Sequence, residues 1–299
     1  MTLYKLLTPK AFAELLSKET KRRIIPVDST WYLPNLNRSG KQEFLDEERL
    51  KGAVYFDIDG VKDMKSEYPH MLPDLSTFNK SMSELGLKKD DILVVYDRIG
   101  NFSAPRCAWT LAVLGHDPVY LLNNFPTLKQ SGYPVETSKV TSFTPYEMSD
   151  YVSNVDLAKK ETVSFEDMQK LVSTGDIKNY QVLDARNLQR FTGEAPEPRP
   201  DLSSGHIPGS QPLPFPEVLN SDKTFTSDRE EMLKKIQDFV SQTGNEFETD
   251  KPTIAMCGTG VSGVIIKTAL EIAGVSNVKL YDGSWTEWVM RDGEVAKGR

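Results

Sequence analysis

The hydrophobic positions of this chain repeat one order of helix and strand signals in its two halves. In each half, a Ser or Thr cap and an amphipathic helical run precede an apolar run of strand length, and two further apolar runs flank a second helical run. The paired apolar runs are Ile24–Asp28 and Val182–Asp184, Ile92–Asp97 and Thr253–Cys257, and Val119–Leu121 and Val278–Leu280. Corresponding residues lie 156 to 160 positions apart. The pattern therefore predicts a duplicated unit.

The alternation of short apolar runs with amphipathic runs predicts the fold class of each half. Parallel strands joined by helical crossovers form a three-layer α/β domain around a central, mainly parallel sheet. We predict a first domain over residues 1–138, a polar linker over 139–160 and a second domain over 161–299. A cleft between two similar domains is the expected place for a small ligand.

Composition and charge exclude several classes of protein. The chain has 299 residues, 38% of them hydrophobic, and its 36 basic and 43 acidic residues give a net charge of −7. A protein that grips nucleic acid needs a basic face, so we expect no direct nucleic-acid partner. No apolar stretch is long enough to span a membrane. The lysine-rich N-terminus contains Glu14 and Glu19, which transit peptides avoid, so we expect it to belong to the fold.

The two cysteines, Cys107 and Cys257, differ in their surroundings. They cannot build a disulfide framework, and no cysteine and histidine spacing is typical of a metal site. Cys257 ends an apolar strand and opens a glycine-rich turn into a helix, where backbone N–H groups and the helix N-terminus attract an anion. This setting favours the thiolate and predicts that Cys257 is a nucleophile. Cys107 lies inside a helical run, and we interpret it as core packing.

Motifs along nearly the whole chain resemble the rhodanese superfamily. The loop Cys257-Gly258-Thr259-Gly260-Val261-Ser262-Gly263 resembles the superfamily's active loop, and specifically its mercaptopyruvate sulfurtransferase pattern of cysteine, glycine, serine or threonine, glycine and valine. The other matching segments are Tyr68–Pro73, Ser103–Arg106, Asp184–Arg186, Arg190–Gly193, Pro196–Arg199, Gly205–Gly209 and Tyr281–Trp285. The resemblance implies tandem rhodanese-like domains, with an inactive first half, where Asp97 replaces the cysteine, and a catalytic second half.

The resemblance also suggests which sulfur donor is used. Thiosulfate-preferring members resemble cysteine-arginine-lysine-glycine-valine at this loop, whereas Gly258 and Thr259 are uncharged here. Charge-assisted hydrogen bonds are the strong ones, so this difference argues against thiosulfate as the best donor. By resemblance, Arg190 and Arg199 bind the carboxylate and carbonyl of 3-mercaptopyruvate, with surface or salt-bridge roles as the alternative. The loop residues Gly258, Gly260, Val261 and Ser262 complete the expected donor site.

The expected reaction needs no metal or organic cofactor. Cys257 takes sulfur from the donor as a covalent persulfide, pyruvate leaves, and thioredoxin or another thiol, such as that of a sulfur-carrier protein, takes the outer sulfur. The family also suggests a relay of Thr259, His70 and Asp59 beside the cysteine, although Asp57 and Asp63 lie near Asp59 in the sequence. We expect the chain in the cytoplasm, with a mitochondrial share left open.

Three other interpretations compete with a sulfurtransferase. A phosphatase of this fold needs an arginine six residues after the cysteine, and position 263 is glycine. A persulfide relay that feeds tRNA wobble-uridine thiolation would use the same chemistry at Cys257 and differ only in its acceptor. A module that only binds is disfavoured by the intact cysteine and the two arginines.

The remaining histidines and two arginines are expected to be structural. His206 lies in a turn before a strand, and His116 follows the helix-ending Gly115, where a cation would suit the helix C-terminus. Arg106 and Arg186 are more readily explained by salt bridges than by donor binding.

Overall fold

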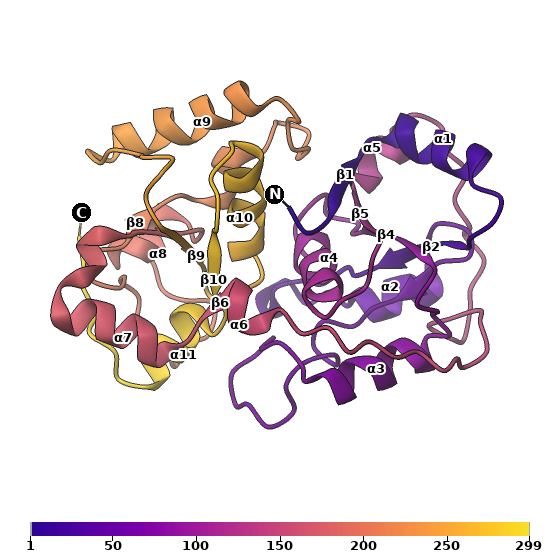
Figure 1. Ribbon diagram of the computed structural model, residues 1–299, viewed down its shortest axis with the longest axis horizontal. Helices are drawn as coiled ribbons and strands as arrows, with labels where there is room; N and C mark the ends of the chain where they lie inside the picture. Colours follow the sequence, from indigo (N-terminus) through magenta and orange to yellow (C-terminus); the bar gives the residue numbers. More distant parts are fainter. Residues whose placement is uncertain (1, 299) are drawn as a thin grey trace.

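The computed structural model describes residues 2–298 and contains two α/β domains side by side (Figure 1). Each domain is built on a five-stranded sheet, with strand order β1-β5-β4-β2-β3 in the first and β6-β10-β9-β7-β8 in the second. All strand pairs within the two sheets are parallel. The two sheets repeat one topology, as the sequence pattern predicts, and they are entirely rather than mainly parallel.

The first domain contains five strands and five α-helices, and a short 3₁₀-helix spans Pro34–Leu36. Its elements are β1 (Lys5–Leu7), α1 (Pro9–Lys18), β2 (Ile24–Asp28), α2 (Gly40–Asp46), β3 (Val54–Tyr55), α3 (Leu75–Glu84), β4 (Ile92–Tyr96), α4 (Ala104–Val113), β5 (Val119–Leu122) and α5 (Phe125–Gln130).

The second domain repeats this plan. Its elements are α6 (Ala158–Glu161), β6 (Thr162–Val163), α7 (Phe165–Thr174), β7 (Gln181–Asp184), α8 (Leu188–Thr192), β8 (Gln211–Pro212), α9 (Arg229–Gln242), β9 (Thr253–Met256), α10 (Gly263–Ile272), β10 (Lys279–Tyr281) and α11 (Ser284–Met290). Two further 3₁₀-helices span Asp176–Asn179 and Phe215–Val218.

Local sequence signals explain where the equivalent first long helices begin. The Thr8 side chain accepts from the backbone of Ala11, with Pro9 in the first turn of α1. Ser164 and Asp167 form a capping box at the start of α7. These side chains satisfy N–H groups that a helix N-terminus leaves without partners. The predicted capped helices are therefore confirmed in both halves.

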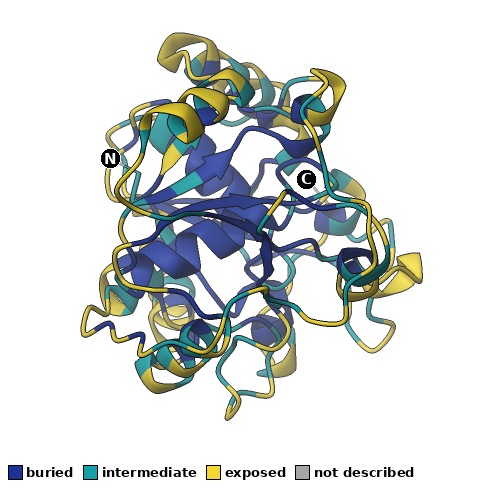
Figure 2. Cartoon of the chain, turned by 90° about the vertical axis from the view of Figure 1, so that its right-hand side faces the viewer, coloured by how far each residue is buried: buried dark blue, intermediate teal, exposed yellow. Residues whose placement is uncertain are grey.

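The strands are buried between helical layers. All residues of β4 and of β9 are buried, which is expected of parallel strands with both faces covered. Figure 2 shows the buried residues gathered in the central strands and the exposed ones on the outer helices and loops. This arrangement places the carboxyl ends of the strands at one edge of each sheet, where ligands of such folds bind.

The segment between the two sheets is packed against the first domain. Residues 131–157 contain no helix or strand. The backbone N–H of Tyr151 donates to Ser83 Oγ at 3.0 Å, and that of Ser153 donates to Asn79 Oδ1 at 2.9 Å. Tyr151 and Ser153 are buried. The predicted linker is polar in composition, but part of it follows a defined path along α3, where hydrogen bonds hold it.

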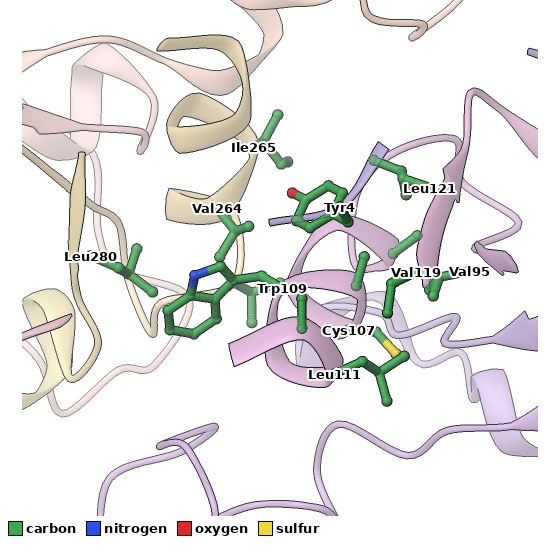
Figure 3. Close-up of a cluster of buried hydrophobic side chains, with 14 of the residues drawn as sticks. Tyr4, Val95, Cys107, Trp109, Leu111, Val119, Leu121, Val264, Ile265 and Leu280 are labelled. Atoms are coloured by element: carbon green, nitrogen blue, oxygen red, sulfur yellow. The ribbon is translucent and has the colours of Figure 1, made fainter. Parts of the chain in front are cut away.

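A shared hydrophobic core joins the two domains. One buried cluster includes Trp109 of α4, Val264 of α10 and Leu280 of β10, and Figure 3 shows these side chains side by side. In the same region, Tyr4 Oη lies 2.5 Å from Thr268 Oγ1. The apolar contact fixes the two domains against each other, so residues from both can form one site.

No helix in residues 2–298 combines the length and the hydropathy that a membrane span requires.

Candidate active site

Cys257 lies between the carboxyl end of β9 and the first turn of α10. Its N–H donates to Ser284 Oγ at 3.1 Å, and its carbonyl accepts from the N–H of Trp285 at 3.0 Å. The residue is 2% exposed. The backbone of Cys257 is therefore anchored to the start of α11, which holds the thiol at the base of the loop.

The loop after Cys257 has backbone donors to spare. Within residues 2–298, the N–H groups of Gly258 to Ser262 donate to no protein acceptor. Gly260 has a φ of +77°, and a Cβ there would lie 2.6 Å from the carbonyl oxygen of Asp282. Only glycine fits this conformation and this contact. The turn thus presents free N–H groups at a helix N-terminus, an arrangement that binds anions.

A pocket with a volume of about 60 Å³ opens onto Cys257. Both domains contribute to its wall, as expected for a site between them. The lining residues are Trp31, Leu33, Pro34, Phe102, Arg190, Glu197, Pro198, Arg199, Leu202, Cys257, Gly258, Thr259, Val261, Ser262 and Thr286. The two arginines predicted to bind the donor therefore share one cavity with the predicted nucleophile.

Arg190 is part of a buried ion-pair network. It lies on α8, which Asn187 caps. Its Nε donates to Glu197 Oε1 at 3.1 Å and its Nη2 donates to Glu197 Oε2. Arg186 Nη1 donates to the same Glu197 Oε1 at 2.8 Å and is paired with Asp184 on its other side. Glu197 therefore bridges two arginines, and Arg186 has the structural role expected of it.

Arg199, the second arginine of the pocket, differs from Arg190 in its surroundings. Among residues 2–298, no carboxylate lies within 4.0 Å of its guanidinium, and its Nη1 donates to Thr286 Oγ1 at 3.4 Å. Burial lowers the pKa of Arg199, and the nearby carboxylates of Asp59 and Glu197 oppose this shift. A half-buried cation with spare donors is suited to an anionic ligand.

Thr259, His70 and Asp59 lie in a hydrogen-bonded line across the two domains. His70 Nδ1 lies 3.0 Å from Thr259 Oγ1, and its Nε2 lies 2.8 Å from Asp59 Oδ1. Asp57 pairs instead with Lys41 at 2.5 Å, and Asp63 caps a turn through the N–H of Lys65 at 2.9 Å. Of the three aspartates near one another in the sequence, Asp59 is the one in contact with His70.

The ionisation of this line follows from its surroundings. Burial lowers the pKa of His70, and the positive charges of Arg106 and Arg199 act in the same direction, against the opposing effect of Asp59. Burial would raise the pKa of Asp59, but its hydrogen bonds from His70 and Trp31 hold that pKa below its ordinary value. The arrangement fits a neutral His70 that donates to a carboxylate and accepts from the hydroxyl of Thr259.

Arg106 connects the first domain to the cysteine loop. Its Nη1 donates to Asp282 Oδ1 at 2.5 Å and to the carbonyl of Gly260 at 3.2 Å, and its Nη2 donates to the carbonyl of His70. These contacts satisfy the guanidinium inside the protein. Arg106 therefore has the salt-bridge role that the sequence predicts for it, and it fixes the position of His70 relative to the loop.

Sequence reasoning missed the aromatic wall of the pocket. Trp31 donates from Nε1 to Asp59 Oδ2 at 2.8 Å, and its ring meets His70 edge-on, with centroids 4.9 Å apart. Phe102 stacks on Trp31. Trp31 follows the carboxyl end of β2, and residues at this end of parallel strands often form a ligand site. Its position after a predicted strand could therefore have identified it as a site residue. Glu197 was missed as a site residue because its role depends on a contact between α8 and a later turn.

The other cysteine and two histidines lie outside the pocket. Cys107 is fully buried in α4, and burial raises the pKa of its thiol. His206 Nδ1 donates to the carbonyl of Phe191 at 2.9 Å. The expectation that His116 acts as a helix-terminal cation is wrong, because burial lowers its pKa to about 4 and leaves it neutral between Tyr151 and the carbonyl of Asp91.

Residues 2–298 contain no group of three or more histidine, cysteine, aspartate or glutamate side chains arranged to hold a metal ion.

Comparison with known proteins assigns both halves to one family. The model of the rhodanese-like domain matches residues 11–125 and again residues 164–291. The two matches fall on the two parallel sheets described above, and together they cover most of the chain.

Two curated relatives match most of this chain. The chain is 52% identical over 295 residues to thiosulfate sulfurtransferase TUM1 of Saccharomyces cerevisiae, covering 98% of this chain and 97% of that protein. It is 38% identical over 275 residues to thiosulfate/3-mercaptopyruvate sulfurtransferase 1, mitochondrial, of Arabidopsis thaliana, covering 88% of this chain and 70% of that protein. The crystal structure of the Saccharomyces cerevisiae Tum1 protein superposes with a TM-score of 0.96 at 50% identity, covering 100% of both chains.

Proposed function

Because the chain belongs to the rhodanese family and is a sulfurtransferase of the thiosulfate/3-mercaptopyruvate sulfurtransferase type, we propose that its second domain transfers sulfur from 3-mercaptopyruvate through a persulfide on Cys257. Pyruvate is the released product and a thiol is the acceptor. Thiosulfate serves as a poorer donor. The first domain supplies part of the pocket wall and the outer members of the relay, but no nucleophile.

The charge distribution around Cys257 is the observation that carries the choice of donor. Positions 258 and 259 are uncharged, so no cation of the loop itself faces the sulfur that Cys257 attacks. The cations of the pocket are Arg190 and Arg199, which lie outside the loop sequence. A donor whose anionic carboxylate is separated from its sulfur by a keto group and a methylene fits cations that lie outside the loop. A small dianion with its charge next to the transferred sulfur does not.

The proposed first step moves one sulfur atom and leaves electrons on carbon. The Cys257 thiolate attacks the sulfur of 3-mercaptopyruvate, and a sulfur–sulfur bond forms as the carbon–sulfur bond breaks. The bonding electron pair stays on the departing carbon as the enolate of pyruvate, which then takes a proton. The free N–H groups of Gly258 to Ser262 are placed to stabilise the persulfide anion.

The second step regenerates the enzyme. An acceptor thiolate attacks the outer sulfur, a new persulfide forms on the acceptor, and Cys257 returns as the thiolate. Thioredoxin or a comparable protein or small thiol is the proposed acceptor, which places the reaction in a reducing compartment such as the cytoplasm. A sulfur-carrier protein on a route to tRNA thiolation is the alternative acceptor, and the chemistry at Cys257 would be the same. Mitochondria are a second location to test.

Thr259, His70 and Asp59 are proposed to handle protons during the first step. Thr259 lines the pocket, and its hydroxyl oxygen lies 3.0 Å from Nδ1 of His70. The Asp59 side chain is 58% exposed, so the line connects the pocket to solvent. A neutral histidine oriented by a carboxylate can accept a proton through the hydroxyl and return one to the enolate.

The experiment that tests this function compares two donors. Specificity constants are measured for 3-mercaptopyruvate, by pyruvate release, and for thiosulfate, by sulfite release, with the same thiol acceptor. We expect a higher kcat/KM for 3-mercaptopyruvate, and a higher value for thiosulfate would contradict the donor assignment.

A variant of Arg199 tests the carboxylate contact in the same assay. Arg199→Gln should lower kcat/KM for 3-mercaptopyruvate by about 10²-fold, because a charge-assisted hydrogen bond in a half-buried pocket is lost. Arg291→Gln is the matched control, since Arg291 pairs with Glu166 and Glu287 and does not line the pocket. An unchanged kcat/KM in Arg199→Gln would show that the carboxylate binds elsewhere.

A further inference from the structure

The pocket wall contains a carboxylate that the proposed chemistry does not use. The Glu197 side chain is 3% exposed, yet it lies on the wall that also holds Arg190, Arg199 and Cys257. A buried carboxylate is costly unless it is paired. Glu197 is paired twice, with Arg186 and with Arg190. A carboxylate in an anion-binding wall reduces the attraction of that wall for anions, so its presence has a consequence for the ligand.

Glu197 binds one edge of the Arg190 guanidinium. Nε and Nη2 face Glu197, which leaves Nη1 for a ligand. A Cβ at Gly258 would lie 3.2 Å from Arg190 Nη2, so the guanidinium stands directly beside the cysteine loop. Arg190 can therefore contact a donor, but its charge is already balanced by Glu197.

The formal charges of this wall leave one cation uncompensated. Arg186 and Arg190 are balanced by Asp184 and Glu197, and Arg199 has no ion pair within residues 2–298. Asp59 is near enough to oppose the lowering of the pKa of Arg199, but its side chain is largely exposed and bonded to His70. Solvent therefore screens its charge. The wall thus offers a net charge of one rather than two.

We propose that Glu197 determines the charge of the donor that the pocket accepts, by neutralising Arg190 so that a monoanionic donor is favoured over a dianionic one. This inference rests on the proposed function. At neutral pH, 3-mercaptopyruvate carries one carboxylate and an ordinary thiol that is mostly protonated, whereas thiosulfate carries two charges. Glu197 contributes to specificity through Arg190 and takes no part in bond making.

The test measures binding of two stable anions to protein that cannot turn over. In the Cys257→Ser background, calorimetric dissociation constants are obtained for pyruvate, a monoanion, and for sulfate, a dianion. Glu197→Gln removes one negative charge and preserves the shape of the side chain. The more positive wall then attracts each negative charge of a ligand by the same additional amount, so the gain in binding free energy is twice as large for sulfate as for pyruvate. The ratio of sulfate affinity to pyruvate affinity should therefore rise by about tenfold.

Asp201→Asn is the matched control for a general change of charge near the pocket. Asp201 is exposed, lies in the same segment as Arg199, and forms no ion pair within residues 2–298. It should leave the affinity ratio within about twofold of the parent, because its charge is screened by solvent. An unchanged ratio in Glu197→Gln, or an equal shift in Asp201→Asn, would overturn the proposal.

A second variant decides the question if Glu197→Gln does not fold. Arg190→Gln leaves the Glu197 carboxylate without its pocket partner, so sulfate affinity should fall by about tenfold more than pyruvate affinity. Equal losses for the two anions would overturn the proposal. Because these measurements need no turnover, they stand even if the kinetic comparison of donors contradicts the proposed function.

Discussion

The loops after β4 and after β9 occupy equivalent positions in their domains, but their backbone N–H groups face different partners. In the first domain, the Asp97 carboxylate is buried and fills its own loop, where it accepts five backbone hydrogen bonds. The donors are the N–H groups of Ile99, Gly100, Phe102, Ser103 and Ala104, at 2.7 to 2.9 Å. In the second domain, Cys257 stands at the same position, and the N–H groups of Gly258 to Ser262 have no protein acceptor within the described chain.

The comparison separates the contribution of the fold, which is a loop of backbone N–H donors, from that of the residue at the start of the loop, Asp97 or Cys257. Both loops gather backbone donors at the start of a helix, which is a general anion-binding arrangement. Burial raises the pKa of Asp97, and the hydrogen bonds of its loop oppose that shift. The first loop thus directs its backbone donors at its own carboxyl group, whereas the second is open to a pocket and can receive an anion formed on sulfur. The same type of loop stabilises the fold in the first domain and, on our proposal, supports catalysis in the second.

Replacing the nucleophile should have the largest effect on this contrast. We predict that Cys257→Ser lowers the rate of pyruvate release from 3-mercaptopyruvate by about 10⁴-fold or more, because the proposed route has no other nucleophile. The circular dichroism spectrum should remain that of the parent. Retained transfer in a folded Cys257→Ser protein would refute the role assigned to the second loop.

Removing the carboxyl group of Asp97 tests the first loop. Asp97→Asn places an amide NH₂ against backbone N–H donors and should lower the free energy of unfolding by about 3 kcal/mol, as measured with urea. Asp222→Asn is the control, because Asp222 also caps a turn through the N–H of Thr224 but does so at the surface. A cost for Asp97→Asn no larger than that of the control would mean that the loop does not depend on its internal carboxylate.

The proposed proton relay extends the comparison to the pocket between the domains. Because burial lowers the pKa of His70, the neutral ring should persist at neutral pH, and activity should fall only at a pH below the ordinary pKa of histidine, as protonation removes the acceptor at Nδ1. His70→Gln should lower kcat by about tenfold and abolish this acidic limb of the pH profile.

A double-mutant cycle distinguishes the relay from a structural role of His70. If His70 acts through Thr259, the double variant His70→Gln with Thr259→Val should be no slower than the slower single variant. Fully additive losses, together with an unchanged acidic limb in His70→Gln, would contradict the relay.

The second cysteine should have the smallest effect. Cys107→Ala removes a buried sulfur from α4 and should lower the free energy of unfolding by about 1 kcal/mol, while transfer rates stay within about twofold of the parent. A large loss of transfer with preserved stability would show that the two cysteines cooperate and would weaken the contrast between the domains.

Much of this architecture was predictable because local signals and tertiary packing agree. Capping residues, apolar strand runs and the duplicated order point to the same two sheets, and the carboxyl end of β9 is where the cysteine is found. The resemblance to the rhodanese superfamily also pointed to Arg190 and Arg199, which line the pocket, and to His70, which contacts the pocket residue Thr259.

The remainder depends on contacts that no local pattern encodes. Whether Arg190 is free or paired is decided by Glu197, which reaches it only through the turn after α8. The buried His116 is hydrogen-bonded to Tyr151 and stacks on its ring, and Tyr151 lies in a segment whose composition resembles a flexible linker. Trp31 enters the site because a shared core fixes the first domain against the second.

Mass spectrometry of the protein after a single half-reaction tests the central claim most directly. The protein is incubated with 3-mercaptopyruvate in the absence of any thiol acceptor, and its cysteine peptides are analysed without reduction. We predict a gain of one sulfur atom on the peptide that contains Cys257 and no gain on the peptide that contains Cys107. Sulfur on Cys107, or pyruvate release with neither peptide modified, would contradict the account.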